Sequence, residues 1–218
     1  MDSRWQNLSD PICHWAETRG DAPALIEGAE RLSYRALAML VAQATVYLHE
    51  LGIGQGDRIG VAPTNSIDHI ILQFALLRIG AILIELAVED SPEALAATAR
   101  LYGIRTIFTE AHVPEPPGIN RIRVDLAWRG RLATMHGDYR STAGGDALQV
   151  ICLTTGSTGA PSGWVLTHRS IMRHATIFKA WRYPEDEVLR LPGHLLNVLP
   201  LRYFRSLASV LIQFSVGG

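Results

Sequence analysis

Compact apolar runs that alternate with longer helical patterns constrain the fold of this 218-residue chain more than any other feature. The runs at residues 58–62, 81–86 and 104–109 are typical of strands, and glycine or proline bounds them. Helical patterns at 65–80 and 91–103 separate these runs. Because the runs are too uniformly apolar to expose one face to water, the sequence predicts an α/β fold with a mainly parallel sheet flanked by helices on both sides.

Small polar residues mark where the helices should begin. Ser33, Asn65 and Ser91 each precede a helical pattern, and their side chains can accept a hydrogen bond from the first free amides of a helix. Gly80 and Gly103 should end the second and third of these helices. Two short extended stretches, separated by a glycine, are expected before the first helix, at residues 24–27 and 31–34.

The pattern weakens after residue 110 and resumes near residue 147. One short strand is expected at 121–126, within an otherwise irregular stretch. Beyond it, the sequence predicts a strand at 147–153, a helix at 170–181, a strand at 195–198 and a helical run at 203–214. We therefore divide the chain into a first α/β subdomain (1–110), a connecting segment (111–146) and the start of a second α/β subdomain (147–218).

Composition excludes several classes of function. The 20 Lys and Arg residues balance the 21 Asp and Glu residues, so no basic surface points to nucleic acid or to an anionic membrane. Cys13 and Cys152 are too few and too far apart for a disulfide framework, and the N-terminus lacks an apolar signal region. Charged and polar residues interrupt the most apolar window, at 70–86. We expect a cytoplasmic protein that contacts neither nucleic acid nor membrane.

The stretch ICLTTGSTGAPSGWVLTHRS at residues 151–170 is the candidate functional site. A strand that ends in Thr-Thr-Gly-Ser-Thr-Gly presents hydroxyl donors and backbone amides, and glycines allow those amides to turn toward an anion such as phosphate. A surface loop without a ligand is the alternative. Two common phosphate loops are excluded, because the segment has neither the lysine of G-x-x-x-x-G-K-[ST] nor the spacing of G-x-G-x-x-G.

The loop TTGSTGAPSG, followed by LTHR, closely resembles the signature of the AMP-forming adenylating enzymes: acyl-CoA synthetases, luciferase-like enzymes and peptide-synthetase adenylation domains. Three earlier blocks resemble the N-terminal part of that family in the same order: DAPALIEGAERLSYRAL, LGIGQGDRIGVAPTNSIDHI and ALLRIGAILIEL. A flavodoxin-like or Rossmann-like domain would not explain that order. The resemblance implies the incomplete N-terminal part of an adenylate-forming enzyme fold.

The resemblance also implies a chemistry. Enzymes of this family activate a carboxylic acid with ATP, release pyrophosphate and usually pass the acyl group to coenzyme A or to the pantetheine of a carrier protein; ATP implies Mg²⁺. The residues implied to bind ATP share small side chains and lie in the loop: Thr154, Thr155, Gly156, Ser157, Thr158, Gly159, Ser162 and Gly163. No metal ligand and no catalytic residue can be assigned.

The chain departs from the family pattern at three positions. Ser162 stands where the family has a lysine that contacts phosphate, and losing that ionic hydrogen bond costs about 1.5 to 3 kcal/mol. Tyr203 stands in or near the place of a family histidine, and Glu85 stands where proline is usual. These departures suggest a degenerate site. For His168, a role in packing or capping and a role in function are equally supported.

The sequence ends at residue 218, before the family's ribose-binding aspartate and the C-terminal domain that carries the catalytic lysine. Two functions follow. The chain could be the N-terminal portion of an AMP-forming ligase, weak or inactive alone and completed by a second polypeptide. The alternative is a non-catalytic relative that binds a nucleotide or a protein partner. The carboxylic acid cannot be inferred, because its pocket draws mainly on the family's second half.

Overall fold

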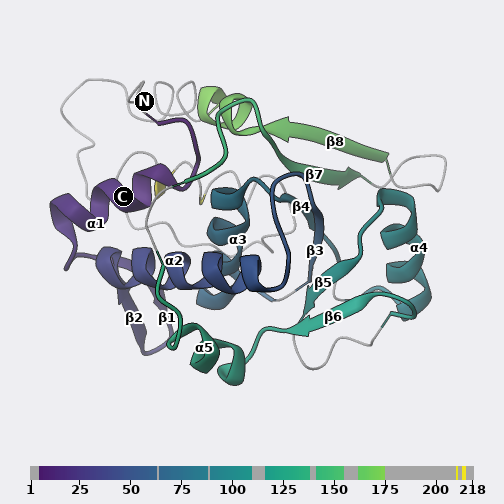
Figure 1. Ribbon diagram of the computed structural model, residues 1–218, viewed down its shortest axis with the longest axis horizontal. Helices are drawn as coiled ribbons and strands as arrows, with labels where there is room; N and C mark the ends of the chain where they lie inside the picture. The colour runs from purple at the N-terminus through teal and green to yellow at the C-terminus, as the bar shows by residue number, and fades with distance from the viewer. Residues whose placement is uncertain are drawn as a thin grey trace.

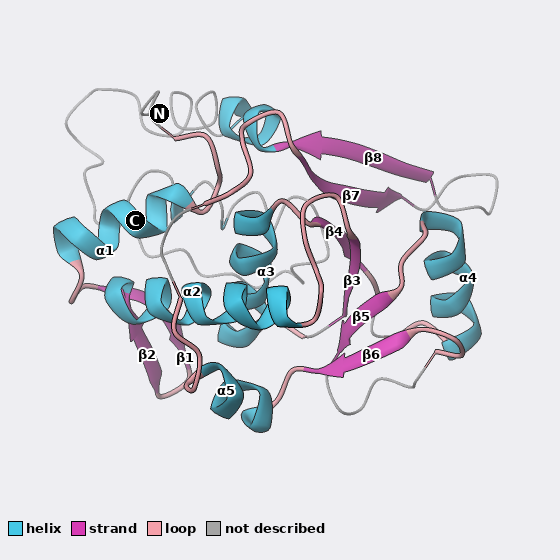
Figure 2. Cartoon of the chain, viewed as in Figure 1, coloured by secondary structure: helices cyan, strands magenta, loops and turns pink. Residues whose placement is uncertain are grey.

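The computed structural model describes residues 5–62, 64–87, 89–109, 116–137, 141–154, 162–174, 210 and 213–214 of the chain (Figure 1). Helices and strands alternate through most of these residues, and one large sheet runs through the centre of the molecule (Figure 2). The helices are α1 (Asp10–Arg19), α2 (Tyr34–Glu50), α3 (Ile67–Ile79), α4 (Pro92–Tyr102) and α5 (Leu126–Leu132). The strands are β1 (Pro23–Glu27), β2 (Glu30–Ser33), β3 (Arg58–Ala62), β4 (Ile82–Glu85), β5 (Thr106–Thr109), β6 (Asn120–Arg123), β7 (Leu148–Thr154) and β8 (Ser162–Thr167).

The large sheet has the strand order β6-β5-β3-β4-β7-β8. Every neighbouring pair from β6 to β7 is parallel, whereas β8 runs antiparallel to β7. The predicted α/β class and mainly parallel sheet are therefore confirmed. The short hairpin β1–β2 forms a separate antiparallel pair, which turns at Gly28 with φ of 57°.

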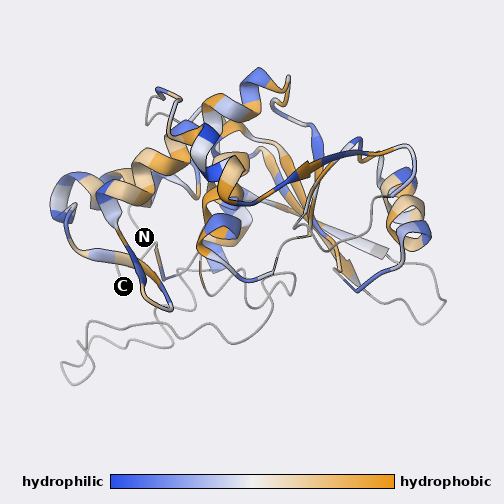
Figure 3. Cartoon of the chain, turned by 90° about the horizontal axis from the view of Figure 1, so that it is seen from below, coloured by the Kyte–Doolittle hydropathy of each residue, from blue (hydrophilic) through white to orange (hydrophobic). Residues whose placement is uncertain are grey.

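Two apolar clusters cover the two faces of the large sheet. On one face, α3 packs over the sheet and shares an apolar cluster with Val61, Leu83 and Val150, and α2 packs against α3. On the other face, α4 packs over Ile82 and Ile84 of β4. Figure 3 shows that the strands between these layers are largely apolar. Helix α3 is the innermost element, since every one of its residues except Asp68 is buried.

The capping residues place the helices as expected, with one shift of a single position. Ser33 Oγ accepts a hydrogen bond from Ala36 N, and Ser91 Oγ accepts one from Ala94 N. Asn65 was expected to cap α3, but the cap is Ser66, whose Oγ accepts from His69 N at 3.1 Å. Asn and Ser are nearly equal as caps, so sequence alone did not separate these neighbours.

Several elements lie outside the predicted set or beyond the described residues. Helix α1, helix α5 and strand β8 were not predicted. Strand β6 lies in the expected connecting segment and pairs with β5, within the same sheet as the strands from residues 1–110 and 147–218. The division at residues 110 and 146 stays a prediction. The strand expected at 195–198 lies outside the described residues.

Candidate functional site

Strands β7 and β8 hold the ends of the predicted phosphate loop. The two strands pair from Leu148 opposite Thr167 to Thr154 opposite Ser162. Residues 155–161, which include Thr155, Gly156, Ser157, Thr158 and Gly159, follow Thr154 in the sequence and lie outside the described residues. Of the predicted site, the structure therefore places the two ends of the loop and Gly163.

The loop leaves the sheet at its carboxyl edge. Because β7 is parallel to β4, with Ile84 opposite Ile151, the end of β7 lies on the same side as the ends of the other parallel strands. In open α/β sheets, ligands bind outside the carboxyl ends of the strands. Thr154, the last described residue before the candidate loop, therefore lies at the edge where such a fold binds a ligand.

Gly163 lies where two elements meet closely. A Cβ at this position would stand 2.6 Å from Ile151 Cγ2 and 3.1 Å from the ring of Tyr102. A larger residue would therefore push β8 away from its neighbours. The structure gives Gly163 a packing reason that the sequence did not indicate, and its predicted contact with ATP stays a prediction.

His168, directly after β8, is buried and joins this hairpin to the N-terminal segment. Its Nδ1 accepts a hydrogen bond from Leu8 N at 3.2 Å, so its proton is carried by Nε2. Burial lowers the pKa of His168 to about 4, against an opposing effect of the nearby Asp10 charge. Of the two roles that the sequence left open, these contacts favour packing.

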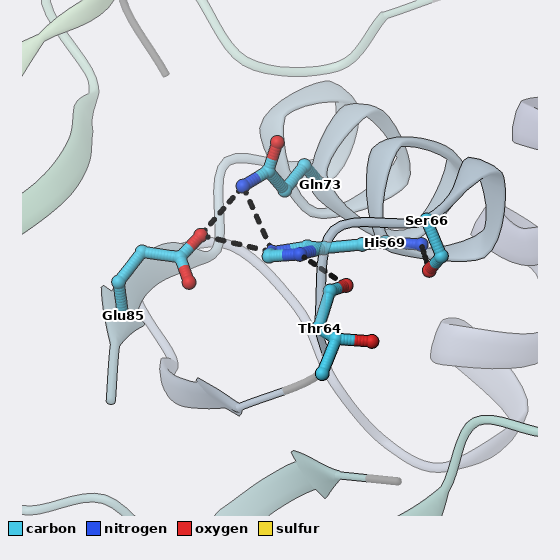
Figure 4. Close-up of polar contacts among 5 residues, drawn as sticks. All are labelled: Thr64, Ser66, His69, Gln73 and Glu85. Atoms are coloured by element: carbon cyan, nitrogen blue, oxygen red, sulfur yellow. Dashed lines mark hydrogen bonds and ion pairs between the residues drawn. The ribbon is translucent and has the colours of Figure 1, made fainter. Parts of the chain in front are cut away.

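Three polar side chains meet at the carboxyl end of β4, and sequence reasoning missed two of them (Figure 4). Glu85 Oε1 accepts a hydrogen bond from Gln73 Nε2 at 2.5 Å and lies 3.2 Å from His69 Nε2. The side chains of His69 and Glu85 are 1% and 5% exposed. The signal for this cluster was present, since His69 and Gln73 are one helical turn apart in a helix that is mostly apolar.

Cys152 lies beside this cluster on β7. Burial, with a smaller contribution from the charge of Glu85, raises the pKa of Cys152 to about 11. The thiol is therefore protonated at neutral pH and is a poor nucleophile. It does not supply a reactive group to the loop that follows.

Within the described ranges, no group of three His, Cys, Asp or Glu residues could hold a metal ion. No helix in the same part of the chain is long and apolar enough to cross a membrane. Tyr203, which stands in or near the place of a family histidine, lies outside the residues that the structure describes.

These observations define an α/β protein in which the strand that precedes the candidate ligand loop ends at the carboxyl edge of a mainly parallel sheet. The model of the AMP-binding enzyme family matches residues 12–218. The chain belongs to the family of AMP-binding enzymes.

Curated relatives include one bacterial and one fungal peptide synthetase. The chain is 29% identical over 201 residues to phosphinothricin tripeptide synthetase PhsC of Streptomyces viridochromogenes, a match that covers 88% of this chain and 18% of the relative. It is 28% identical, over an alignment of 237 positions, to the polyketide synthase-nonribosomal peptide synthetase hybrid himA of Aspergillus japonicus. That match covers 97% of this chain and 5% of the relative. The chain thus spans less than a fifth of the length of either protein.

Among solved structures, the fold is similar to the inhibitor-bound N-terminal domain of FACL13 from Mycobacterium tuberculosis. The TM-score is 0.82 at 22% sequence identity, and the match covers 96% of this chain and 55% of that one. At this identity, the likeness shows the fold, which is the N-terminal part of an adenylate-forming enzyme.

Proposed function

We propose that the chain is the N-terminal portion of an AMP-forming carboxylic acid ligase. In the reaction, a carboxylate oxygen attacks the α-phosphorus of ATP, pyrophosphate leaves with the bridging oxygen, and an acyl-adenylate forms. A thiol then displaces AMP to give a thioester. The observation that carries the proposal is the family match over residues 12–218.

The loop at residues 154–163 is the proposed site for the ATP phosphates. Its donors are uncharged hydroxyls and backbone amides, which suit phosphate oxygens when they are held in place before the ligand arrives. The paired ends of β7 and β8 would hold them so. Mg²⁺ would accompany ATP and offset the phosphate charge, as in other phosphoryl-transfer sites.

The thiol acceptor is either coenzyme A or the pantetheine of a carrier protein. The two peptide synthetases among the relatives favour a carrier protein, whereas the structural likeness to FACL13 carries no information on the acceptor. A cytoplasmic location is part of the same proposal, since both acceptors occur there.

Ser162 supports a second candidate function, nucleotide binding without turnover. The family lysine at this position contacts the outer phosphates, and serine keeps a hydrogen bond but not the charge. ATP affinity would decrease, and the reaction rate would decrease further, because charge on the phosphate oxygens grows as pyrophosphate leaves. A protein that retained ATP affinity but no exchange activity would fit this candidate.

Pyrophosphate exchange into ATP separates the two candidates. The chain is mixed with a separately produced C-terminal half of a related ligase, and exchange is measured with a panel of fatty, aromatic and amino acids. The ligase proposal predicts acid-dependent exchange that increases in Ser162→Lys. If no acid in the panel supports exchange, even with Ser162→Lys, only the binding function remains.

A further inference from the structure

Three residues close to the N-terminus are buried against segments that lie far away in the sequence (Figure 1). Asn7, Leu8 and Ser9 are each at most 2% exposed. They precede α1, so the hydrogen bonds of a helix or a sheet do not hold their backbone amides. The ends of a domain are poorly ordered unless specific contacts tie them down. The contacts of residues 6–10 therefore decide how this segment behaves.

Asn7 joins two distant segments through its side chain. Its Nδ2 donates to the carbonyl oxygen of Leu77, near the end of α3, at 2.9 Å, and to that of Ala143 at 3.1 Å. Both bonds are buried. Asn7 Oδ1 accepts a third hydrogen bond, from Ser9 N at 2.9 Å. Because a buried polar group is costly to leave without a partner, this one side chain holds both attachments.

Leu8 and Asp10 add two further attachments. Leu8 N donates to Nδ1 of His168, directly after β8, at 3.2 Å. Asp10 Oδ1 accepts a hydrogen bond from Ser141 Oγ at 2.8 Å, whereas its Oδ2 accepts one from Asn7 N at 2.8 Å. The carboxylate of Asp10 therefore closes the N-terminal segment on itself and ties it to residue 141.

Residues 141–146 bind two of the same partners. The amide of Thr142 donates to the carbonyl oxygen of Arg78, near the end of α3, at 3.0 Å. The amide of Arg169, two residues after β8, donates to the carbonyl oxygen of Gly145 at 2.8 Å. The N-terminal segment, this stretch, the end of α3 and the chain after β8 therefore meet at one place.

We propose that residues 6–10 act as a clasp, which opens and closes as one unit and, when closed, fixes residues 141–146 and the chain directly after β8 to α3. The bonds of the clasp depend on one another, because Asn7 and Leu8 are adjacent and the carboxylate of Asp10 holds the amide of Asn7. Loss of one bond therefore loosens the others. The inference is independent of the proposed nucleotide function.

The opposite face of the sheet should stay folded while the clasp is open. Leu8 belongs to the apolar cluster on the α3 face, whereas Ile107 and the buried side of α4 belong to the cluster on the other face. Proteins open locally in contiguous units, at a lower free energy than that of global unfolding. The clasp is therefore expected to open more often than the chain unfolds as a whole.

Native-state hydrogen exchange, measured by NMR at increasing urea concentrations, tests the clasp on the unaltered chain. The amides of Leu8, Thr142 and Arg169 report on its attachments. The proposal predicts that all three exchange with the same opening free energy and the same dependence on urea. It also predicts that this free energy is lower than that of the amides of β3, which lies between β5 and β4 in the sheet.

Two variants separate the clasp from the rest of the fold. Asn7→Ala removes the bonds to Leu77 and Ala143, so the three amides should exchange about tenfold faster or more. Ile107→Val is the control, because it removes one buried methylene from the face that stays packed when the clasp opens. It should accelerate exchange in β3 but leave the three amides of the clasp unchanged.

Three results would overturn the proposal. In the wild-type chain, unequal opening free energies of the three amides would show that the segment does not move as a unit. Values equal to those of β3 would show that it opens only with the whole fold, and so would equal acceleration of the three amides in Asn7→Ala and Ile107→Val. The first two results need no variant, so the test does not depend on whether a variant folds.

Discussion

His168 makes the stability of the protein depend on pH. Burial holds its pKa in the folded state at about 4, below the ordinary value of 6.5, so the unfolded chain binds the proton more tightly. The contribution of the neutral His168 ring to the free energy of unfolding is complete above pH 6.5 and is lost as the pH falls from 6.5 to 4. It amounts to about 3 kcal/mol.

Urea unfolding of the wild type and of His168→Asn at several pH values checks this dependence. Asparagine can keep the acceptor for Leu8 N but does not titrate. The free energy of unfolding of the wild type should fall more steeply than that of the variant between pH 6.5 and 4. Parallel pH profiles would contradict the account.

At the same scale, the residues that sequence reasoning missed are those whose roles depend on distant partners. Glu85 was noted only as a departure from the family pattern, because its partners His69 and Gln73 lie in another element. Gly163 was assigned to phosphate binding because it falls in the signature, whereas its close approach to Ile151 depends on how β8 pairs with β7. Such contacts cannot be seen in a local pattern.

At the scale of elements, two glycines with the same φ angle distinguish the cost of backbone strain from the cost of close packing when each is replaced by alanine. Gly52 and Gly80 both have φ of 75°. A Cβ on Gly52 meets nothing within 4 Å, whereas one on Gly80 would stand 2.7 Å from Ala143 Cβ. Gly52→Ala should therefore lower the free energy of unfolding only by the strain of the left-handed conformation, about 1 kcal/mol. Gly80→Ala should cost a further 1 to 3 kcal/mol, roughly, for overpacking.

Thermal or urea unfolding of the two variants gives this comparison directly. Equal destabilisation of Gly52→Ala and Gly80→Ala would mean that the end of α3 does not pack against Ala143 as the structure shows. A larger effect at Gly52 would contradict the account of both turns.

Elements with local signals at both ends were predictable, and those without were not. Helix α4 has a serine cap, a proline in its first turn and a left-handed glycine at its end, and its predicted bounds agree with the structure. Strand β8 exposes Trp164 and Val165 and begins in a glycine-rich stretch, so it lacks the alternation that identifies a strand. Its identity depends on pairing with β7.

At the scale of the whole molecule, a residue near the C-terminus completes the main apolar cluster. Phe214 is buried against Tyr34 and Phe74, with ring centroids 6.0 Å and 5.1 Å away, and its carbonyl accepts a hydrogen bond from Trp15 Nε1 at 2.7 Å. Phe214→Ala should lower the free energy of unfolding by about 3 to 5 kcal/mol.

Leu126→Ala is the control for this variant, since Leu126 is 89% exposed and its loss should cost less than about 0.5 kcal/mol. Both are measured by urea unfolding. Similar stability of Phe214→Ala and Leu126→Ala would show that the terminal residues do not belong to the core.

The parallel sheet was predictable at this scale because its strands are buried on both faces and therefore read as continuous apolar runs. The strand order was not predictable, since it depends on which crossover passes over which face. Strand β6 shows where prediction from sequence stops. Its sequence alternates charged and apolar residues, as expected for an edge strand, but nothing in that local pattern identifies β5 as its neighbour.

The central claim is that the loop at residues 154–163 binds the phosphates of a nucleotide through uncharged donors, and titration of ATP into three proteins tests it most directly. The wild type should bind ATP, and Ser162→Lys should bind it about ten- to a hundredfold more tightly, because a charged hydrogen bond is restored. Ser162→Met introduces a side chain about as long as lysine but without charge, so this variant should bind ATP no more tightly than the wild type. Absence of binding in both the wild type and Ser162→Lys, with all three proteins folded, would contradict the account.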